Sequence, residues 1–377
     1  MKNFIYADNA ATTKLDIDAF DAMKPYLLED YSNASQPYFF SIQSKRALKE
    51  ARKTIAACIG ASPDEIYFTS GGTESDNWAI KCFGTRNDVQ VRKVYTSAIE
   101  HHAVLNACEC ATRLSVDPQG IVSPIVLENA FNSEGNPVTN CQSTLVSVML
   151  ANNEIGTIEP IKELAAVAHA HAALFHTDAV QAVGHIPIDV NELGVDMLSA
   201  SAHKFNGPKG IGFLYVRKKT LLFPFVNGGS QEHGMRAGTE NVASIVAMTA
   251  ALKKNCNEMW QTTDKLRAME NAFIDTLKMA NIDFIRNGSD NRVPGNINIS
   301  IRDASGEMLL HRLDLMGICI STGSACDSVN TQVSHVIKAI GLSQDYAEGT
   351  IRVSFGRDNK FEDAVAVAKA IIGVLQR

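Results

Sequence analysis

Short apolar runs alternate with amphipathic stretches through the first two thirds of the chain. Within 41–60 and 161–171, apolar residues recur at the three- and four-residue spacing of a helix that buries one face. The short apolar runs predict strands at 66–69, 94–97, 145–150, 174–177, 197–201 and 212–216. Strands that alternate with helices predict an α/β fold whose mostly parallel sheet carries helices on both faces.

The last third has a different order of elements. Gly228-Gly229 and a long helical pattern over 242–279 suggest that the chain leaves the large sheet here. Beyond it the patterns predict strands at 296–301, 319–321 and 350–354 and helices at 307–316, 333–340 and 361–375. We therefore expect a large domain over 13–255 and a small α+β domain formed by 1–12 and 256–377.

Composition narrows the class of protein. The chain has 377 residues, of which 45% are hydrophobic, so it can bury one large core and a smaller one. A net charge of −6 gives no general attraction to nucleic acid, and direct nucleic-acid binding is not expected. No stretch has the length and apolarity of a membrane span, and no signal peptide precedes the first elements, so we expect no membrane association and a cytoplasmic protein.

The cysteines are expected to be reduced thiols, because eight of them occur in a long chain without a secretion signal. Cys108 and Cys110 lie near two histidines, but their spacing lacks the partner pair of a zinc site, and we expect no metal.

Lys204 follows the apolar run 197–201 and precedes the glycine-rich bend 207–210. A lysine at the carboxyl end of a strand can lie in a partly dry site, where desolvation lowers its pKa and favours an imine with a carbonyl cofactor. The alternative is a solvated loop lysine. Asp178 follows another predicted strand and can hold the protonated ring nitrogen of pyridoxal phosphate, although a helix N-cap is the plainer interpretation of an isolated aspartate.

A phosphate site is indicated by the strand 66–69, the turn 70–73 and the helix that follows. Free amides of a first helical turn, with the hydroxyl of Thr73, suit a phosphate dianion. An ordinary strand-turn-helix connection has the same pattern. No Gly-Lys-Ser or Gly-Lys-Thr follows, so the segment is not a nucleotide P-loop.

These residues resemble those of pyridoxal-phosphate-dependent cysteine desulfurases in the class V aminotransferase family, of the NifS and IscS type. The matching segments are 6–13, 68–77, 100–104, 152–156, 177–181, 201–204, 235–241 and 321–326. The resemblance implies fold type I of pyridoxal phosphate enzymes, a homodimer, L-cysteine as substrate and a sulfur-acceptor protein as partner.

The resemblance also assigns roles to individual residues. Lys204 would carry the cofactor and move the substrate's α-proton, and His101 would stack on the ring, although a structural histidine is the alternative. The other implied cofactor ligands are Gly72, Thr73, Asn153, Asp178, Gln181, Ser201, His203 and, from the second subunit, Thr239. Arg352, with Asn33 beside it, would bind the substrate carboxylate; without the resemblance it would be interpreted as a solvated edge-strand charge.

Cys326 distinguishes a desulfurase from other enzymes of the family. The small residues 323–325 predict a loop that brings a thiolate to the substrate sulfur and carries that sulfur away as a persulfide. Asp327 departs from the family pattern and disfavours the thiolate, and the segment 33–38 lacks the expected histidine. The acceptor could serve iron-sulfur assembly, tRNA thiolation or DNA phosphorothioation.

Two other functions are compatible with parts of this pattern. One is an aminotransferase or selenocysteine lyase that acts on another amino acid, for which Cys326 would be a spare thiol. The other is a non-catalytic scaffold that binds pyridoxal phosphate.

Overall fold

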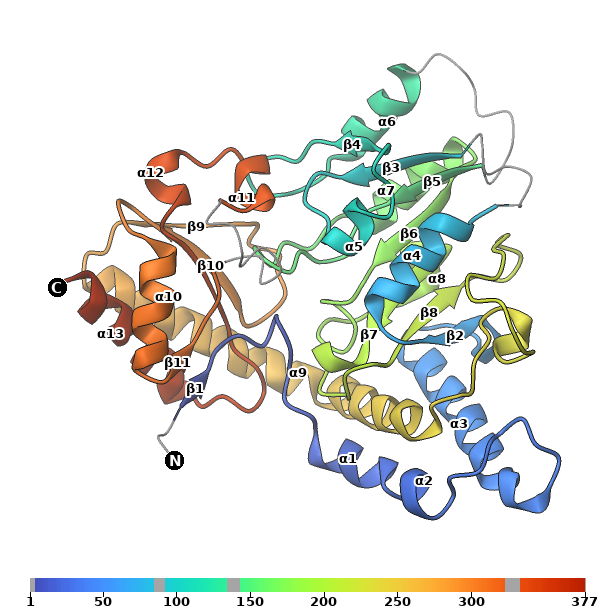
Figure 1. The fold of residues 1–377 in the computed structure, drawn as a ribbon. Coiled ribbons are helices and arrows are strands. Elements are labelled where there is room, and N and C mark those ends of the chain that lie inside the picture. Colours follow the sequence, from blue (N-terminus) through green and yellow to red (C-terminus); the bar gives the residue numbers. More distant parts are fainter. Residues whose placement is uncertain (1–3, 85–91, 134–142, 323–332, 377) are drawn as a thin grey trace.

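A computed structural model describes residues 4–84, 92–133, 143–322 and 333–376 (Figure 1). Cys326 and Asp327 lie outside the described residues. Among the described helices, none is long and apolar enough to cross a lipid bilayer.

The largest sheet of the described chain has seven strands in the order β2-β8-β7-β6-β5-β3-β4. Only β8 runs antiparallel to its neighbours, and the other neighbouring pairs are parallel. The strands are β2 (Ile66–Thr69), β3 (Lys93–Ser97), β4 (Thr112–Leu114), β5 (Thr144–Ser147), β6 (Leu174–Asp178), β7 (Met197–Ser201) and β8 (Gly212–Val216). The predicted α/β fold with a mostly parallel sheet is confirmed.

Both faces of this sheet are buried. Leu145, Leu174 and Met197 pack in one core with Trp78 of α4 (Gly72–Cys82). Their neighbours Val146, Phe175 and Leu198 point the other way into the largest core, with residues of α3, α7 and α9. Alternate side chains of each central strand therefore serve two apolar layers, as expected of a covered parallel sheet. The helices of this part are α1 (Ile17–Met23), α2 (Pro25–Leu28), α3 (Ile42–Cys58), α5 (His102–Leu105), α6 (Pro124–Ser133), α7 (Ile161–Ala170) and α8 (Val190–Leu193).

A second, antiparallel sheet has the order β12-β10-β9 and lies beside a parallel pair of β1 and β11. These strands are β1 (Ile5–Tyr6), β9 (Phe284–Arg286), β10 (Asn296–Ile301), β11 (Ile318–Cys319) and β12 (Thr350–Ser354). The helices are α10 (Gly306–Leu315), α11 (His335–Ala339), α12 (Gln344–Ala347) and α13 (Phe361–Leu375). Residues of α9, β10, β12 and α13 form a separate apolar core for this part.

Helix α9 (Val242–Met279) connects the two sheets, packing on α1 and α3 at one end and on α13 near the other (Figure 1). It continues without interruption through the expected domain boundary at 255/256, so the two-domain division stays a prediction. The predicted strand over 145–150 is too long, since β5 ends at Ser147. Beyond Ser147 the chain continues toward the carboxyl end of the sheet, where the amide of Leu150 donates to the carbonyl of Asp178 at 2.9 Å.

Candidate active site

A cavity of about 250 Å³ lies where β6 and β7 end. Among the described residues, its lining includes most of the predicted site: Gly72, Thr73, His101, Asn153, Asp178, Gln181, Ser201, His203, Lys204 and Arg352. Its other lining residues are Ala10, Ala11, Asp76, Met149 and Val180. Side chains from segments that are far apart in sequence therefore share one space, as expected at the carboxyl ends of parallel strands.

Lys204 lies in a short 3₁₀ turn (Ala202–Lys204) directly after β7. Its Nζ donates hydrogen bonds to the carbonyls of Ala10 at 2.6 Å and Ala11 at 2.8 Å. The turn is anchored to the same N-terminal segment, because the amide and hydroxyl of Thr13 both donate to the carbonyl of His203. The amine is thus positioned at the cavity wall by backbone acceptors.

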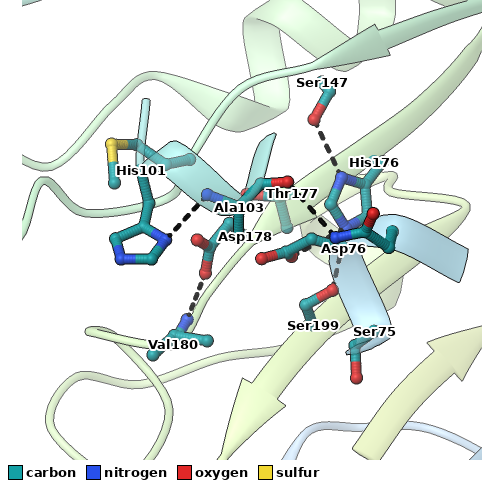
Figure 2. Close-up of polar contacts among 12 residues, drawn as sticks. Ser75, Asp76, His101, Ala103, Ser147, His176, Thr177, Asp178, Val180 and Ser199 are labelled. Carbon is teal, nitrogen blue, oxygen red and sulfur yellow. Dashed lines mark hydrogen bonds and ion pairs between the residues drawn. The ribbon is translucent and has the colours of Figure 1, made fainter. Parts of the chain in front are cut away.

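Asp178 ends β6, with its Oδ1 accepting a hydrogen bond from the Val180 amide at 2.9 Å (Figure 2). Burial raises the pKa of this carboxyl, while His101, the Val180 amide and Lys204 act in the opposite direction. A buried acid of this kind is stabilised in its charged form by a cation that enters the cavity. Asp178 is therefore a suitable partner for a protonated ring nitrogen.

His101 caps the N-terminus of α5, and its Nδ1 accepts a hydrogen bond from the Ala103 amide at 3.1 Å (Figure 2). Burial lowers its pKa, Lys204 lowers it further, and Asp178 opposes both. Since Nδ1 is an acceptor, the neutral ring carries its proton on Nε2.

The turn before α4 has the close packing that an anion cradle requires. Gly71 has φ of 151°, and a Cβ on Gly72 would approach Cγ2 of Val180 to 2.6 Å. Gly72 and Thr73, in the first turn of α4, therefore belong to the cavity wall. Such a helix start binds phosphate dianions well.

His203 and Ser201 line the same cavity. The Nδ1 of His203 lies 3.1 Å from Oγ1 of Thr12. Burial first, and then the nearby Lys204 and Lys209, lower the pKa of His203 to about 4. This imidazole is therefore neutral near pH 7 and can still donate one hydrogen bond to an anion.

Arg352 lies on β12 and is only 2% exposed. Its Nη1 donates to the Asn153 carbonyl at 2.9 Å, and its Nη2 donates to Oδ1 of Asp8 at 2.7 Å. It is thus buried and oriented, and the interpretation as a solvated edge-strand charge is wrong. Its backbone also pairs with Ser321, through hydrogen bonds of 2.7 and 3.0 Å.

Gln181 also contacts the N-terminal segment, because its Nε2 donates to the Ala10 carbonyl at 3.0 Å. That carbonyl is therefore shared by Gln181 and Lys204. Asn153 contributes its backbone carbonyl to Arg352, while its side chain is part of the cavity lining.

Two predicted residues are absent from the described lining of this cavity. Asn33 uses its Oδ1 to accept a hydrogen bond from the Ser35 amide at 2.8 Å. Thr239 is exposed in the loop before α9, so its contribution to a second subunit stays a prediction, as does the role of Asn33. Cys326, the predicted nucleophile, falls outside the described residues.

The sequence alone assigns no role to Asp8 or Asp76. A signal for Asp76 exists, because it follows Gly72 by four residues and so shares its face of α4. Asp8, Ala10 and Ala11 belong to the segment 6–13, whose motif indicated a family and not a function for each position.

Comparison with known proteins agrees with this geometry. The profile of the family described as aminotransferase class-V matches residues 5–367. The chain is 46% identical over 371 residues to the cysteine desulfurase IscS of Dictyoglomus turgidum, covering 96% of this chain and 92% of that protein. A solved NifS-like protein superposes with a TM-score of 0.88 at 31% identity, covering 99% of this chain and all of its own. A structure described as SspA in complex with cysteine has a TM-score of 0.80 at 33% identity, covering 93% of this chain and 99% of that one.

Proposed function

The chain belongs to the aminotransferase class-V family, and from that premise we propose that it is a cysteine desulfurase. It converts L-cysteine to L-alanine and transfers the sulfur to a cysteine of its own, from which an acceptor takes it. The observation that carries the proposal is the single cavity lined by Lys204, Asp178 and Arg352. These three side chains supply an amine, a buried acid and a guanidinium group that can bind a carboxylate.

The cofactor that fits this cavity is pyridoxal 5'-phosphate. Asp178 would hold the protonated ring nitrogen, Lys204 the aldehyde carbon, and the first turn of α4 with Thr73, Ser201 and His203 the phosphate. The glycine at position 72 supports the fit, because a Cβ there would collide with Val180 and displace the turn. When bound, this cofactor supplies an electron sink for the negative charge that develops on the substrate's α-carbon.

The residues of the chain perform the remaining steps. Arg352 binds the α-carboxylate of cysteine through charge-assisted hydrogen bonds and so orients the substrate. Lys204 takes the α-proton, for which it needs its neutral amine. His101, neutral with its proton on Nε2, covers the ring and moves protons during alanine formation.

Sulfur transfer is assigned to Cys326 from the resemblance of the segment 321–326. Its thiolate attacks Sγ of the substrate, so that an S–S bond forms while the Cβ–Sγ bond breaks and its electron pair passes to the alanine carbon skeleton. Protonation at Cβ completes alanine, and Cys326 keeps the sulfur as a persulfide. An acceptor thiol then takes the outer sulfur.

We further propose a cytoplasmic homodimer in which Thr239 of each subunit contributes to the phosphate site of the other. The exposed position of Thr239, away from the described lining of its own cavity, supports this arrangement. Sedimentation equilibrium tests the dimer.

Incubation with L-cysteine and a thiol reductant tests the activity. The proposal expects equal amounts of alanine and sulfide. Pyruvate and sulfide without alanine, or no product from loaded enzyme, would contradict it.

A further inference from the structure

A row of buried polar side chains crosses the central sheet beneath α4. Ser147 of β5, His176 of β6 and Ser199 of β7 alternate with residues that point to the opposite face, so all three lie on the α4 side (Figure 2). Two residues earlier on each strand, the same face carries a leucine or a methionine. The polar row is therefore a local departure from an apolar layer, directly next to the cavity.

His176 is the centre of this row and has no exposed surface. Its Nδ1 lies 2.9 Å from Oγ of Ser147, and its Nε2 lies 2.9 Å from Oγ of Ser199. Burial lowers the pKa of His176 to about 3, so the ring is neutral. One ring nitrogen therefore donates and the other accepts.

Asp76 of α4 ends the row. It is 1% exposed, it lines the cavity, and its Oδ1 lies 3.7 Å from Nε2 of His176. The carboxyl oxygen of Asp76 beside Nε2 favours the tautomer of the neutral ring that carries its proton on Nε2, with Oγ of Ser199 as the acceptor. Nδ1 of His176 then accepts from Ser147, and the direction of the whole row is defined.

Asp76 and Asp178 are two buried acids at the wall of one cavity. Two carboxylates that share a dry site do not both ionise readily, and the one with more donors keeps the charge. Asp178 has the Val180 amide, with His101 and Lys204 lowering its pKa. Oδ1 of Asp76, by contrast, has no hydrogen-bond partner among the described residues.

The groups around Asp76 also differ from those around Asp178 in their charge. His176 of β6 approaches its Oδ1 to 3.7 Å but is neutral, and Asp178 and Glu100 are acids. His101 at the start of α5 and Lys204 after β7 act on Asp178. Burial, and then Asp178, raise the pKa of Asp76 well above its ordinary value.

We propose that Asp76 is a positioning residue that holds a proton at the end of the Ser147–His176–Ser199 row and leaves Asp178 as the single charged carboxylate facing the cofactor ring. The part that concerns the ring rests on the proposed function. The direction of the row does not, because it follows from the position of the Asp76 carboxyl beside Nε2 of His176.

The first test measures the tautomer of His176 in the purified full-length protein by ¹⁵N NMR of labelled histidine, with His176→Asn to identify the signal. The expected result is one neutral form with the proton on Nε2, retained in Asp76→Asn, which keeps a side-chain oxygen beside Nε2. Asp76→Ala should give a mixture of tautomers, since that oxygen is lost. An unchanged His176 signal in Asp76→Ala would overturn the proposed row.

The second test uses cofactor labelled with ¹⁵N at the ring nitrogen. Asp76→Asn imitates a neutral carboxyl, so it should leave the ring-nitrogen signal in its protonated range and change cofactor affinity by no more than about twofold. Asp178→Asn should lose the protonated signal and weaken cofactor binding. If Asp76→Asn loses the protonated signal as Asp178→Asn does, Asp76 is charged and the proposal is wrong.

Glu159→Gln is the matched control. Glu159 is also a buried acid with one oxygen that lacks a partner in the described chain, but it is absent from the described lining of the cavity. Glu159→Gln should change neither the His176 signal nor the signal of the cofactor ring nitrogen. A change in either would show that the effects of the Asp76 substitutions come from general destabilisation. A protein that binds no pyridoxal phosphate would refute the proposed function while the His176 signal still reports on the row.

Discussion

Arg352 and Asp8 form an ion pair at the cavity, with Nη2 of the arginine 2.7 Å from Oδ1 of the aspartate. The two residues are separated by 344 positions in the sequence, and the pair joins β12 to the segment after β1. Because Arg352 is buried, Asp8 and the Asn153 carbonyl provide the polar contacts that water would otherwise supply. In the proposed function, a substrate carboxylate would therefore meet an arginine that is already oriented.

Substitution of Arg352 by alanine should weaken L-cysteine binding far more than cofactor binding. A charge-assisted hydrogen bond contributes about 1.5–3 kcal/mol, so the loss of one or two should raise the KM for cysteine at least tenfold. Arg292→Ala is the control, because Arg292 is a buried arginine that donates to the carbonyls of Asn287 and Gly288. Spectral titration with cysteine that is unaltered in Arg352→Ala would show that another residue holds the carboxylate.

Asp8→Asn should destabilise the fold, because it removes the charge that compensates the buried Arg352. The amide oxygen still accepts from Nη2 but carries no charge, so the free energy of unfolding should decrease by about 1–2 kcal/mol, measured by urea denaturation. Asp21→Asn, which breaks the exposed pair with Lys24, should change it by less than about 1 kcal/mol. Equal effects of the two substitutions would argue against a structural role for the Asp8–Arg352 pair.

Lys204 should be the residue that carries the cofactor. The purified protein is expected to be yellow, and borohydride reduction followed by peptide mapping should identify a pyridoxyl group on Lys204. Lys209→Ala should keep both the colour and the modified peptide. A pyridoxyl group on Lys209, or on no lysine, would refute the cofactor assignment.

Glu159 should make stability depend on pH. Burial raises its pKa from 4.5 to about 8 in the folded protein. Between these values the folded state holds a proton that the unfolded state releases, so the contribution of this group to stability falls as pH rises. Glu159→Gln should therefore gain stability relative to the wild type as pH increases from about 4.5 to 8. A difference that is constant over that range would show that Glu159 is ionised in the folded state.

Much of the site was predictable because strand ends have a known place in a parallel sheet. Lys204 and Asp178 each follow an apolar strand, and such ends meet at one edge. Asp76 was not predictable in this way, since its approach to His176 requires that α4 lie over β6. The ion pair of Asp8 with Arg352 likewise depends on how the N-terminal segment reaches β12.

The ends of helices and strands were likewise predictable where local sequence defines them, and not where tertiary contacts do. Strongly patterned elements such as α9 and α13 begin and end where the sequence predicts. Strand β4 (Thr112–Leu114) was missed because it has three residues, of which two are exposed and polar. Pairing with β3, and not apolar pattern, defines it.

The most direct measurement of the central claim is mass spectrometry of the protein after a single turnover with L-cysteine. The account predicts one added sulfur atom on the peptide that contains Cys326. In Cys326→Ser, cysteine should still bind and change the spectrum, while alanine release and the added sulfur are lost, because substrate binding uses Arg352 and Lys204 and not the thiol. Sulfur that fragmentation of this peptide locates on Cys319, or alanine formation at the wild-type rate in the serine variant, would contradict the account.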